Sequence, residues 1–370
     1  MEVNFGRSRQ FSVGVEEEFQ LLDAESCELV SRYDEVVHAM GDDPRVRPEL
    51  LRSTVEVATN IAETVPAAID DTRALRRRLR DAAAEHGSLI ASAGTHPFSR
   101  YEHQEVTPTP RYEQLLEDLR WIADRGLIFG LHVHVGLGDA QAAISVANAL
   151  RTHLPELLAL SANSPFWLGR DTGLASTRIK VFDAFPRSGL PPAFASFEEF
   201  ELLVERGLKT RSFDDYTYIW WDLRPHPRLG TIEVRICDAQ TRIESTAAIV
   251  ALVQSLAATY ADRYERDGVL PAQPRPLLEE NKWRAARYGL DAELIWLERD
   301  EERPAREAVA ALVALAEPAA QRLGCGEEIA AVSRICERGA GADEQRRVLA
   351  ESESLLSVTR WLVETTASSL

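Results

Sequence analysis

Four short segments of the chain place charged side chains at every second residue, opposite an apolar face. These segments are 11–19, 54–57, 127–135 and 230–236. A β-strand turns successive side chains to opposite faces, so residues i and i+2 lie side by side. The pattern therefore predicts strands of one sheet that has an apolar face and a face carrying acids, histidines and an arginine.

The predicted polar face is rich in groups that bind divalent metal. Its members are Glu16, Glu18, Glu56, His132, His134, Glu233 and Arg235. Carboxylates beside an imidazole suit Mg²⁺ or Mn²⁺, whereas zinc favours cysteine and histidine sets. Solvent exposure alone explains the alternation in any single strand, so the metal hypothesis depends on the strands together. Glu17 falls on the apolar face, where it either reaches a partner or sits at a bulge.

Glu49 is a further acid whose contribution depends on the path of the chain. Glu49 and Glu56 are seven residues apart, which puts them on opposite faces of one straight strand. Both could serve one site only if the chain bends between them. The segment 48–53, which begins with Pro48, is a candidate for such a bend.

Several arginines are candidates for binding phosphate or carboxylate, because guanidinium offers a planar bidentate fork. Arg235 is favoured, since it shares a strand face with Glu233. The remaining candidates, each balanced against a surface salt bridge, are Arg52, Arg178, Arg187 and Arg224. The arginine-rich cluster 76–80 is interpreted as a solvated helix face, and His96 as a core histidine.

Strands and helices alternate over residues 1–243, and residues 244–370 read as mainly helical. Together they predict a single catalytic domain over 1–370, with the helical part packed on the sheet-forming part. We expect helices over 64–86, 111–124, 139–160 and 197–207, strands over 88–95, 216–223 and 231–237, a long loop over 169–192 and a break over 271–276. The segment 224–230 is expected to join the last two strands.

The composition of the chain limits the classes of molecule that it is expected to bind. A formal net charge of −17 argues against nucleic acid or an anionic membrane as a main partner. We expect a cytoplasmic protein, because the four cysteines have no CxxC spacing and neither a leader pattern nor a run of 18 apolar residues is present. The sequence lacks GxxxxGK[ST] and a GxGxxG after a strand. A nucleotide would therefore be held by metal and arginine.

A set of motifs along the chain is similar to a known family. The motifs are Gly14–Phe19, Val55–Thr59, Gly94–Phe98, Leu131–Val135, Trp220–Pro225, Gly230–Asp238 and Glu280–Gly289. In this order they resemble the type 2 glutamate–cysteine ligases, or carboxylate–amine ligases, of the glutamine synthetase-like superfamily. The resemblance implies an α+β fold, in which a curved, mainly antiparallel sheet forms an active-site funnel, is flanked by helices and is followed by a helical C-terminal part.

The resemblance also implies an activity and roles for residues. It implies an ATP-dependent, ADP-forming ligase that makes an amide, nominally from glutamate and cysteine, through an acyl phosphate at a Mg²⁺ site. The implied metal positions are Glu16, Glu18, Glu49, Glu56, His132 and Glu233. Arg235 would contact the transferring phosphoryl group beside Glu233. Weaker matches, as substrate or nucleotide contacts, are His134, Arg224 and Arg284.

Small-molecule substrates, an amino-acid carboxylate and an amine, are the expected partners, and the family is compatible with a homodimer. Three alternatives remain open. The first is a ligase of the same mechanism with a different amino acid or amine. The second is a metal-dependent hydrolase that uses the same face without ATP. The third is a nucleotide-binding protein without turnover.

Overall fold

The alternating segments form the centre of a seven-stranded sheet in the order β10-β11-β5-β1-β3-β2, with β4 also paired to β1. The computed structural model describes residues 1–268, 270 and 272–370, so Pro271, at the start of the expected break, lies outside the described residues. Its strands are β1 (Val13–Asp23), β2 (Val46–Pro48), β3 (Thr54–Ala58), β4 (Ser88–Ala91), β5 (Gly130–Gly136), β10 (Leu223–His226) and β11 (Thr231–Asp238). The neighbouring strands of this sheet pair antiparallel throughout its described residues.

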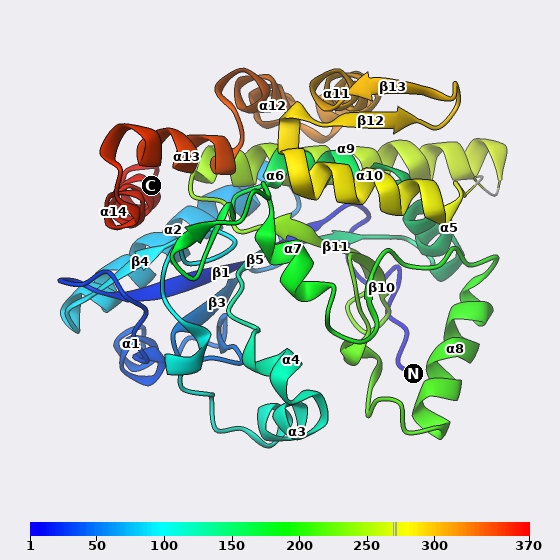
Figure 1. Cartoon of the computed structure of the whole chain (residues 1–370). Helices are drawn as coiled ribbons and strands as arrows, with labels where there is room; N and C mark the ends of the chain where they lie inside the picture. The colour runs from blue at the N-terminus through cyan, green and yellow to red at the C-terminus, as the bar shows by residue number, and fades with distance from the viewer. Residues whose placement is uncertain (269, 271) are drawn as a thin grey trace.

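Helices cover the apolar face of the sheet. Side chains of β1, β5 and β11, such as Val15, Val133 and Val234, join one buried cluster with residues of these helices. The helices are α2 (Val65–Glu85), α5 (Ala140–Leu150), α6 (Leu154–Ser161) and α9 (Ile243–Asp267). By length and composition α9 could cross a membrane, but 89% of its apolar window is buried inside the protein. It is the central core helix of the molecule (Figure 1).

The C-terminal part is mainly helical, as the sequence predicts. Helices α11 (Ala305–Leu323) and α12 (Gly326–Arg338) pack on α9, and α10 (Arg275–Tyr288) packs on α6. Figure 1 shows α11 and α12 on the side of α9 that faces away from the sheet. The remaining elements of this part are β12 (Glu293–Trp296), β13 (Glu301–Pro304), α13 (Gly341–Ser352) and α14 (Leu355–Ser368), which contacts β4.

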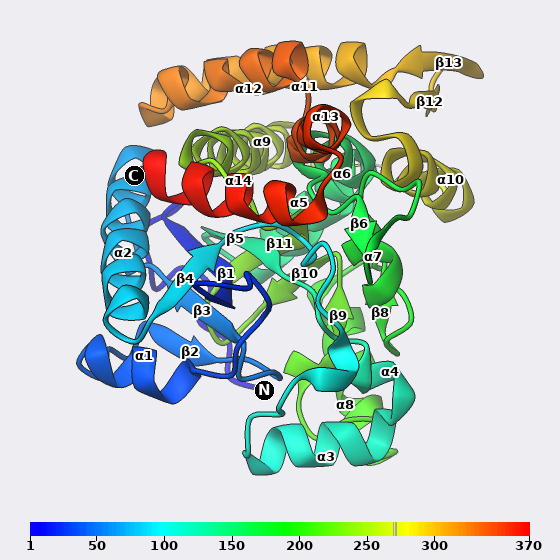
Figure 2. The ribbon, with the colours of Figure 1, turned by 60° about the vertical axis from the view of Figure 1, so that its left-hand side comes forward.

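Shorter elements complete the fold. They are α3 (Pro110–Leu119), α4 (Trp121–Asp124), α7 (Thr177–Phe182), α8 (Phe197–Lys209), β6 (Phe166–Trp167), β7 (Arg170–Asp171), β8 (Ser188–Gly189) and β9 (Trp220–Trp221). Figure 2 shows α3, α4 and α8 on the side of the sheet opposite α11 and α12. Helix α1 (Tyr33–Ala39) packs on α2.

Several expected elements differ from the structure. The helix expected over 111–124 is broken at Arg120, whose φ is 50°. The helix expected over 139–160 is interrupted by a 3-10 turn at 151–153, and α6 restarts with Pro155 in its first turn, where a missing N–H costs nothing. The loop expected over 169–192 contains α7.

The strand expected over 216–223 is also displaced. Residues 216–218 form a 3-10 turn, and β10 extends to His226, so Arg224 lies in a strand and not in the connection. The sequence was misleading because Pro225 follows Arg224, and proline usually ends a strand. Here β10 is at the end of the strand order, where a proline is tolerated.

Candidate active site

A cavity of about 600 Å³ opens over the polar face of the central strands. Nine of the ten site residues predicted from the sequence line it, and Arg284 is the exception. The nine are Glu16, Glu18, Glu49, Glu56, His132, His134, Arg224, Glu233 and Arg235. A volume of this size is within the range of small-molecule sites in proteins.

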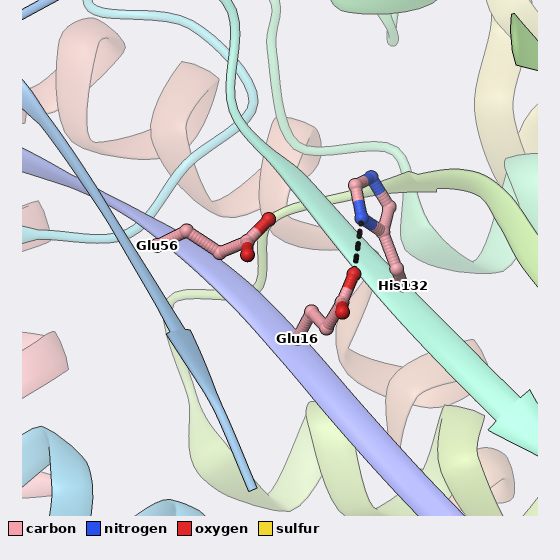
Figure 3. Close-up of side chains that lie close together, drawn as sticks. All are labelled: Glu16, Glu56 and His132. Atoms are coloured by element: carbon pink, nitrogen blue, oxygen red, sulfur yellow. Dashed lines mark hydrogen bonds and ion pairs between the residues drawn. The ribbon is translucent and has the colours of Figure 1, made fainter. Parts of the chain in front are cut away.

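Strand register brings acids and imidazoles together across this face. Glu16 of β1 is opposite His132 of β5, and Glu18 is opposite Glu56 of β3. The Nδ1 atom of His132 lies 3.3 Å from Glu16 Oε2 (Figure 3). Glu233 of β11 is opposite His134. The two-residue spacing therefore identified the residues that share the cavity face.

Three groups of three side chains have ligand atoms within 4.8 Å of one another. They are Glu16, Glu56 and His132; Glu16, His134 and Glu233; and Glu18, Glu49 and Glu56. Glu16 and Glu56 each belong to two groups, so the groups form one continuous cluster of oxygen and nitrogen donors. Carboxylate oxygens with imidazole nitrogens are the donors expected for Mg²⁺ or Mn²⁺.

The bend required to bring Glu49 beside Glu56 is present. Residues 49–53 connect β2 to β3, with a bend at Leu50 and a turn at 52–53, and the two acids then line the same cavity. Burial, and after it the charge of Glu18, raises the pKa of Glu49 to about 8. Burial, and after it the charge of Glu16, raises the pKa of Glu56 well above its ordinary value. These acids therefore lie in an electrostatic environment that a cation would relieve.

Two histidines offer ring nitrogens that could bind a metal ion. Burial, followed by the charge of Arg235, lowers the pKa of His132, which keeps its imidazole neutral as metal binding requires. Within the described part of the chain, the Nε2 atoms of His132 and His134 are buried without a hydrogen-bond partner. His134 Nδ1 lies 3.0 Å from the Thr231 hydroxyl, which orients the ring. The donor set therefore fits a divalent cation.

Arg47 supplies a positive charge that the sequence did not reveal. Its Nη1 lies 3.1 Å from Glu16 Oε1 and 3.4 Å from Glu56 Oε1. Register explains the contact, because Arg47 of β2 is opposite Glu56 of β3. Its side chain is 51% exposed, so this guanidinium can move away from the acids at low cost.

Glu233 lies between two arginines. Arg224 Nε donates to it at 2.6 Å, and Arg235 Nη1 donates to its other oxygen. Burial opposes ionisation of Glu233, but Arg224 and Arg235 hold its pKa well below the ordinary value. Arg224 Nη1 also donates to the carbonyls of Thr217 at 2.9 Å and Ile219 at 2.7 Å. Arg224 is thus fixed by the protein on several sides.

Arg178 lies at the cavity, whereas Arg52, Arg187 and Arg284 are held elsewhere. Arg284 pairs with Glu280 at 2.9 Å and Glu302 at 2.7 Å. Arg52 forms surface pairs with two acids, and Arg187 donates to the carbonyl of Tyr218 at 3.0 Å.

Glu17 and Arg76 form a buried pair on the opposite, apolar face. Arg76 Nε and Nη2 donate to the two carboxylate oxygens of Glu17 at 2.8 and 2.6 Å, and both side chains are at most 1% exposed. The interpretation of 76–80 as a solvated helix face is therefore wrong for Arg76. A signal was available, because Thr72, Arg76 and Leu79 share one buried face of α2. His96 is buried, as expected, with Nε2 2.9 Å from the carbonyl of Cys27.

Comparisons with known proteins show the family of this chain. The model of glutamate–cysteine ligase family 2 matches residues 12–360. A Rubrobacter xylanophilus protein named "Putative glutamate--cysteine ligase 2-3" is 47% identical over 371 residues, covering 99% of this chain and 100% of the relative. A second protein of that organism, "Putative glutamate--cysteine ligase 2-1", is 42% identical over 372 residues, covering 100% and 98%.

Solved structures show the same fold. A glutamate–cysteine ligase from Francisella tularensis in complex with AMP aligns with a TM-score of 0.71 and 13% identity, over 98% of this chain and 90% of that one. A bifunctional glutathione synthetase from Pasteurella multocida aligns with a TM-score of 0.66 and 13% identity, over 97% of this chain and 53% of that one. The predicted fold class is confirmed. The chain belongs to glutamate–cysteine ligase family 2, a family of ATP-dependent amide-forming ligases.

Proposed function

We propose that this protein joins an amino-acid carboxylate to an amine with release of ADP, through an acyl-phosphate intermediate at a Mg²⁺ site. The nominal substrates are glutamate and cysteine, as the names of its relatives suggest. The observation that carries the proposal is the cavity face on which five glutamates, two histidines and Arg235 converge. The AMP in the Francisella tularensis complex supports use of an adenine nucleotide.

Six side chains would hold the divalent cations, with Mn²⁺ as an alternative to Mg²⁺. They are Glu16, Glu18, Glu49, Glu56, His132 and Glu233, and His134 adjoins them. Such cations would offset negative charge as a phosphoryl group is transferred. Glu16 and Glu56, which belong to two groups each, could serve as ligands in either.

Arg235 is the residue that we assign to the transferring phosphoryl group. Its Nη1 is held by Glu233, while its Nε is buried and has no hydrogen-bond partner among the described residues. The charge of Glu233 raises the pKa of Arg235 against the effect of burial, so the guanidinium remains charged. A fixed cation at developing charge contributes on the order of 10²–10³ in rate.

The cavity also has cations for the carboxylates of amino-acid substrates. Arg47, Arg111 and Arg228 also line it. Nucleotide binding would not require a glycine-rich loop in this arrangement, because metal and arginine would bind the phosphates. We further propose one catalytic domain over 1–370, since α10 and α11 pack on α6 of the sheet-forming part. A cytoplasmic location and a homodimer, with which the family is compatible, are also part of the proposal.

The decisive experiment measures ADP release with Mg²⁺ over a panel of amino-acid and amine pairs, with the product mass identified. Glutamate with cysteine should release ADP and give a product of the mass of γ-glutamylcysteine. A different productive pair would retain the mechanism and replace the substrates. ADP release no faster than background for every pair would overturn the proposal.

Two further outcomes identify the alternatives. Hydrolysis of an amide or phosphoester without nucleotide would indicate the metal-dependent hydrolase. Calorimetric binding of ATP without product would indicate a non-catalytic nucleotide-binding protein. Arg235→Lys and Arg284→Lys form a matched pair of variants, because only the first residue lines the cavity. The ligase proposal requires Arg235→Lys, and not Arg284→Lys, to lower the rate of ADP release by on the order of 10²–10³.

A further inference from the structure

Strand β11 contains a bulge at the arginine assigned to the phosphoryl group. Val234 is paired with Val133 of β5, and Cys237 is paired with Leu131. Two residues of β11, Arg235 and Ile236, therefore stand opposite the single residue between those partners, His132. A bulge of this type redirects a side chain and removes backbone groups from the sheet ladder. The direction of Arg235 thus depends on what holds the bulge.

The backbone of the bulge is bound by groups outside the β5–β11 ladder. The carbonyl oxygen of Asp222 accepts the N–H of Arg235 at 2.8 Å and that of Ile236 at 3.1 Å. Arg178 donates Nη2 to the carbonyl of Arg235 and Nη1 to that of Ile236, each at 3.2 Å. One carbonyl and one guanidinium therefore satisfy four backbone groups of the bulge.

Asp222 is itself held by a buried lysine from the C-terminal part. Lys282 Nζ, on α10, lies 2.7 Å from Asp222 Oδ2 and 2.7 Å from Asp183 Oδ1. Asp222 is 1% exposed and Lys282 is 5% exposed. Removing one member of a buried ion pair leaves the other uncompensated, so loss of the Lys282 ammonium would leave the buried Asp222 carboxylate without its ion-pair partner.

We propose that Lys282 is a positioning residue for Arg235. Lys282 fixes Asp222, the carbonyl of Asp222 fixes the bulge, and the bulge directs the Arg235 guanidinium into the cavity. Lys282 is not one of the described residues that line the cavity, so it acts through its neighbours. The effect of Lys282 on turnover rests on the proposed function, whereas its effect on the position of Arg235 does not. The inference links helix α10 to the phosphoryl end of the site.

Lys180 provides a matched control. Its Nζ also lies 2.7 Å from an oxygen of Asp183, but it pairs with Oδ2, and its side chain is 36% exposed. Both variants, Lys282→Met and Lys180→Met, remove one ammonium from Asp183. Only the first removes the partner of Asp222. A difference between the two variants therefore reports on Asp222 and not on a general loss of charge.

The first measurement is hydrogen exchange at the amides of Arg235 and Ile236 in the whole protein. Lys282→Met should speed their exchange by about tenfold, the equivalent of one weakened hydrogen bond, and Lys180→Met should leave it unchanged. Asp222→Asn is the second variant in case Lys282→Met does not fold, and it should have the same effect. Wild-type exchange in the folded variants would overturn the inference.

The second measurement separates positioning from stability through kinetics. Lys282→Met should lower kcat by roughly 10- to 100-fold, with a much smaller change in the KM for ATP. In the background of Arg235→Lys it should cause little further loss, because both changes act on one guanidinium. Independent losses that multiply would show that Lys282 does not act through Arg235. If the wild type forms no ADP, the proposed function fails, and the exchange measurement still decides the positioning.

Discussion

Glu16 and Glu17 are neighbours in strand β1, yet they lie on opposite faces of the sheet in different electrostatic environments. Glu17 on the apolar face has Arg76 as a bidentate partner, and Thr246 donates to it at 2.7 Å. Glu16 on the cavity face has two histidines and the half-exposed Arg47, and it shares the cavity with four further glutamates. The same residue type is therefore paired on one face and crowded with like charge on the other.

The difference between the two faces of β1 indicates that one contributes to stability and the other to function. A buried acid with a complete set of partners holds the fold together, and removing its partner is costly. Buried acids that lie together without enough cations reduce stability until a ligand supplies positive charge. The apolar face of β1 is therefore expected to respond to mutation through unfolding, and the cavity face through metal binding and turnover.

The largest expected effect is on the cavity face. Glu16→Gln should reduce kcat/KM for ADP release by on the order of 10³, because Glu16 belongs to two of the three ligand groups. Burial opposes ionisation of Glu16, but His134 and His132 hold its pKa well below the ordinary value, so the melting temperature of the metal-free protein should fall somewhat when this charge is removed. The comparison would break if Glu17→Gln weakened metal binding more than Glu18→Gln, because the two faces would then be exchanged.

The second effect belongs to the apolar face. Arg76→Met should lower the free energy of unfolding by about 3–5 kcal/mol, because Glu17 would remain buried without its partner. Urea denaturation followed by circular dichroism measures this change. The activity per folded molecule should stay near that of the wild type. A stable Arg76→Met protein with lost activity would assign this pair to the site and not to the core.

The third effect is a dependence of stability on pH. The pKa of Glu49 is raised to about 8, so its protonated form is favoured in the folded protein. That stabilisation is complete below the ordinary value near 4.5 and is lost as the pH rises toward and through 8. His134, whose pKa is raised by Glu16 and Glu233 against burial, changes in the same direction.

Metal-free protein should therefore melt at a lower temperature at pH 8 than at pH 6, and Mg²⁺ should raise the melting temperature more at pH 8. Differential scanning fluorimetry with and without Mg²⁺ measures both effects. Glu49→Gln is the matched variant and should flatten the dependence. Equal stabilisation by Mg²⁺ at the two pH values would show that Glu49 does not bind the cation.

The smallest effect is expected at a pair outside both faces. Arg52 contacts Asp34 and Glu105, whose side chains are 69% and 63% exposed. Arg52→Ala should therefore cost about 1 kcal/mol or less and leave the kinetic constants unchanged. A large loss of activity would mean that this arginine moves into the cavity when substrate binds.

The sequence predicted the two faces because alternation is a local property of a strand. Each of β1, β3, β5 and β11 showed its polar face without knowledge of its neighbours. The neighbours themselves are set by sheet topology. The pairing of Arg47 with Glu56 therefore could not be predicted, because β2 is only three residues long and carries no periodic signal.

The predictions that differed depended on contacts between distant segments. Arg76 was assigned to solvent from the density of arginines around it, although its position on the buried face of α2 pointed to a partner. The bulge at Arg235 could not be predicted, because it depends on the carbonyl of Asp222 outside β11. Lys282 likewise has its role through Asp222, which is 60 positions earlier in the chain.

The strand order has a consequence for how the protein matures. The ligand groups join β1, near the start of the chain, to β5 and to β11, which ends at Asp238. Contacts of such high sequence separation form late in folding. Nascent chains therefore have no site until β11 has docked. A divalent ion that binds the finished cluster stabilises only completed molecules, and thereby selects them over partly folded ones.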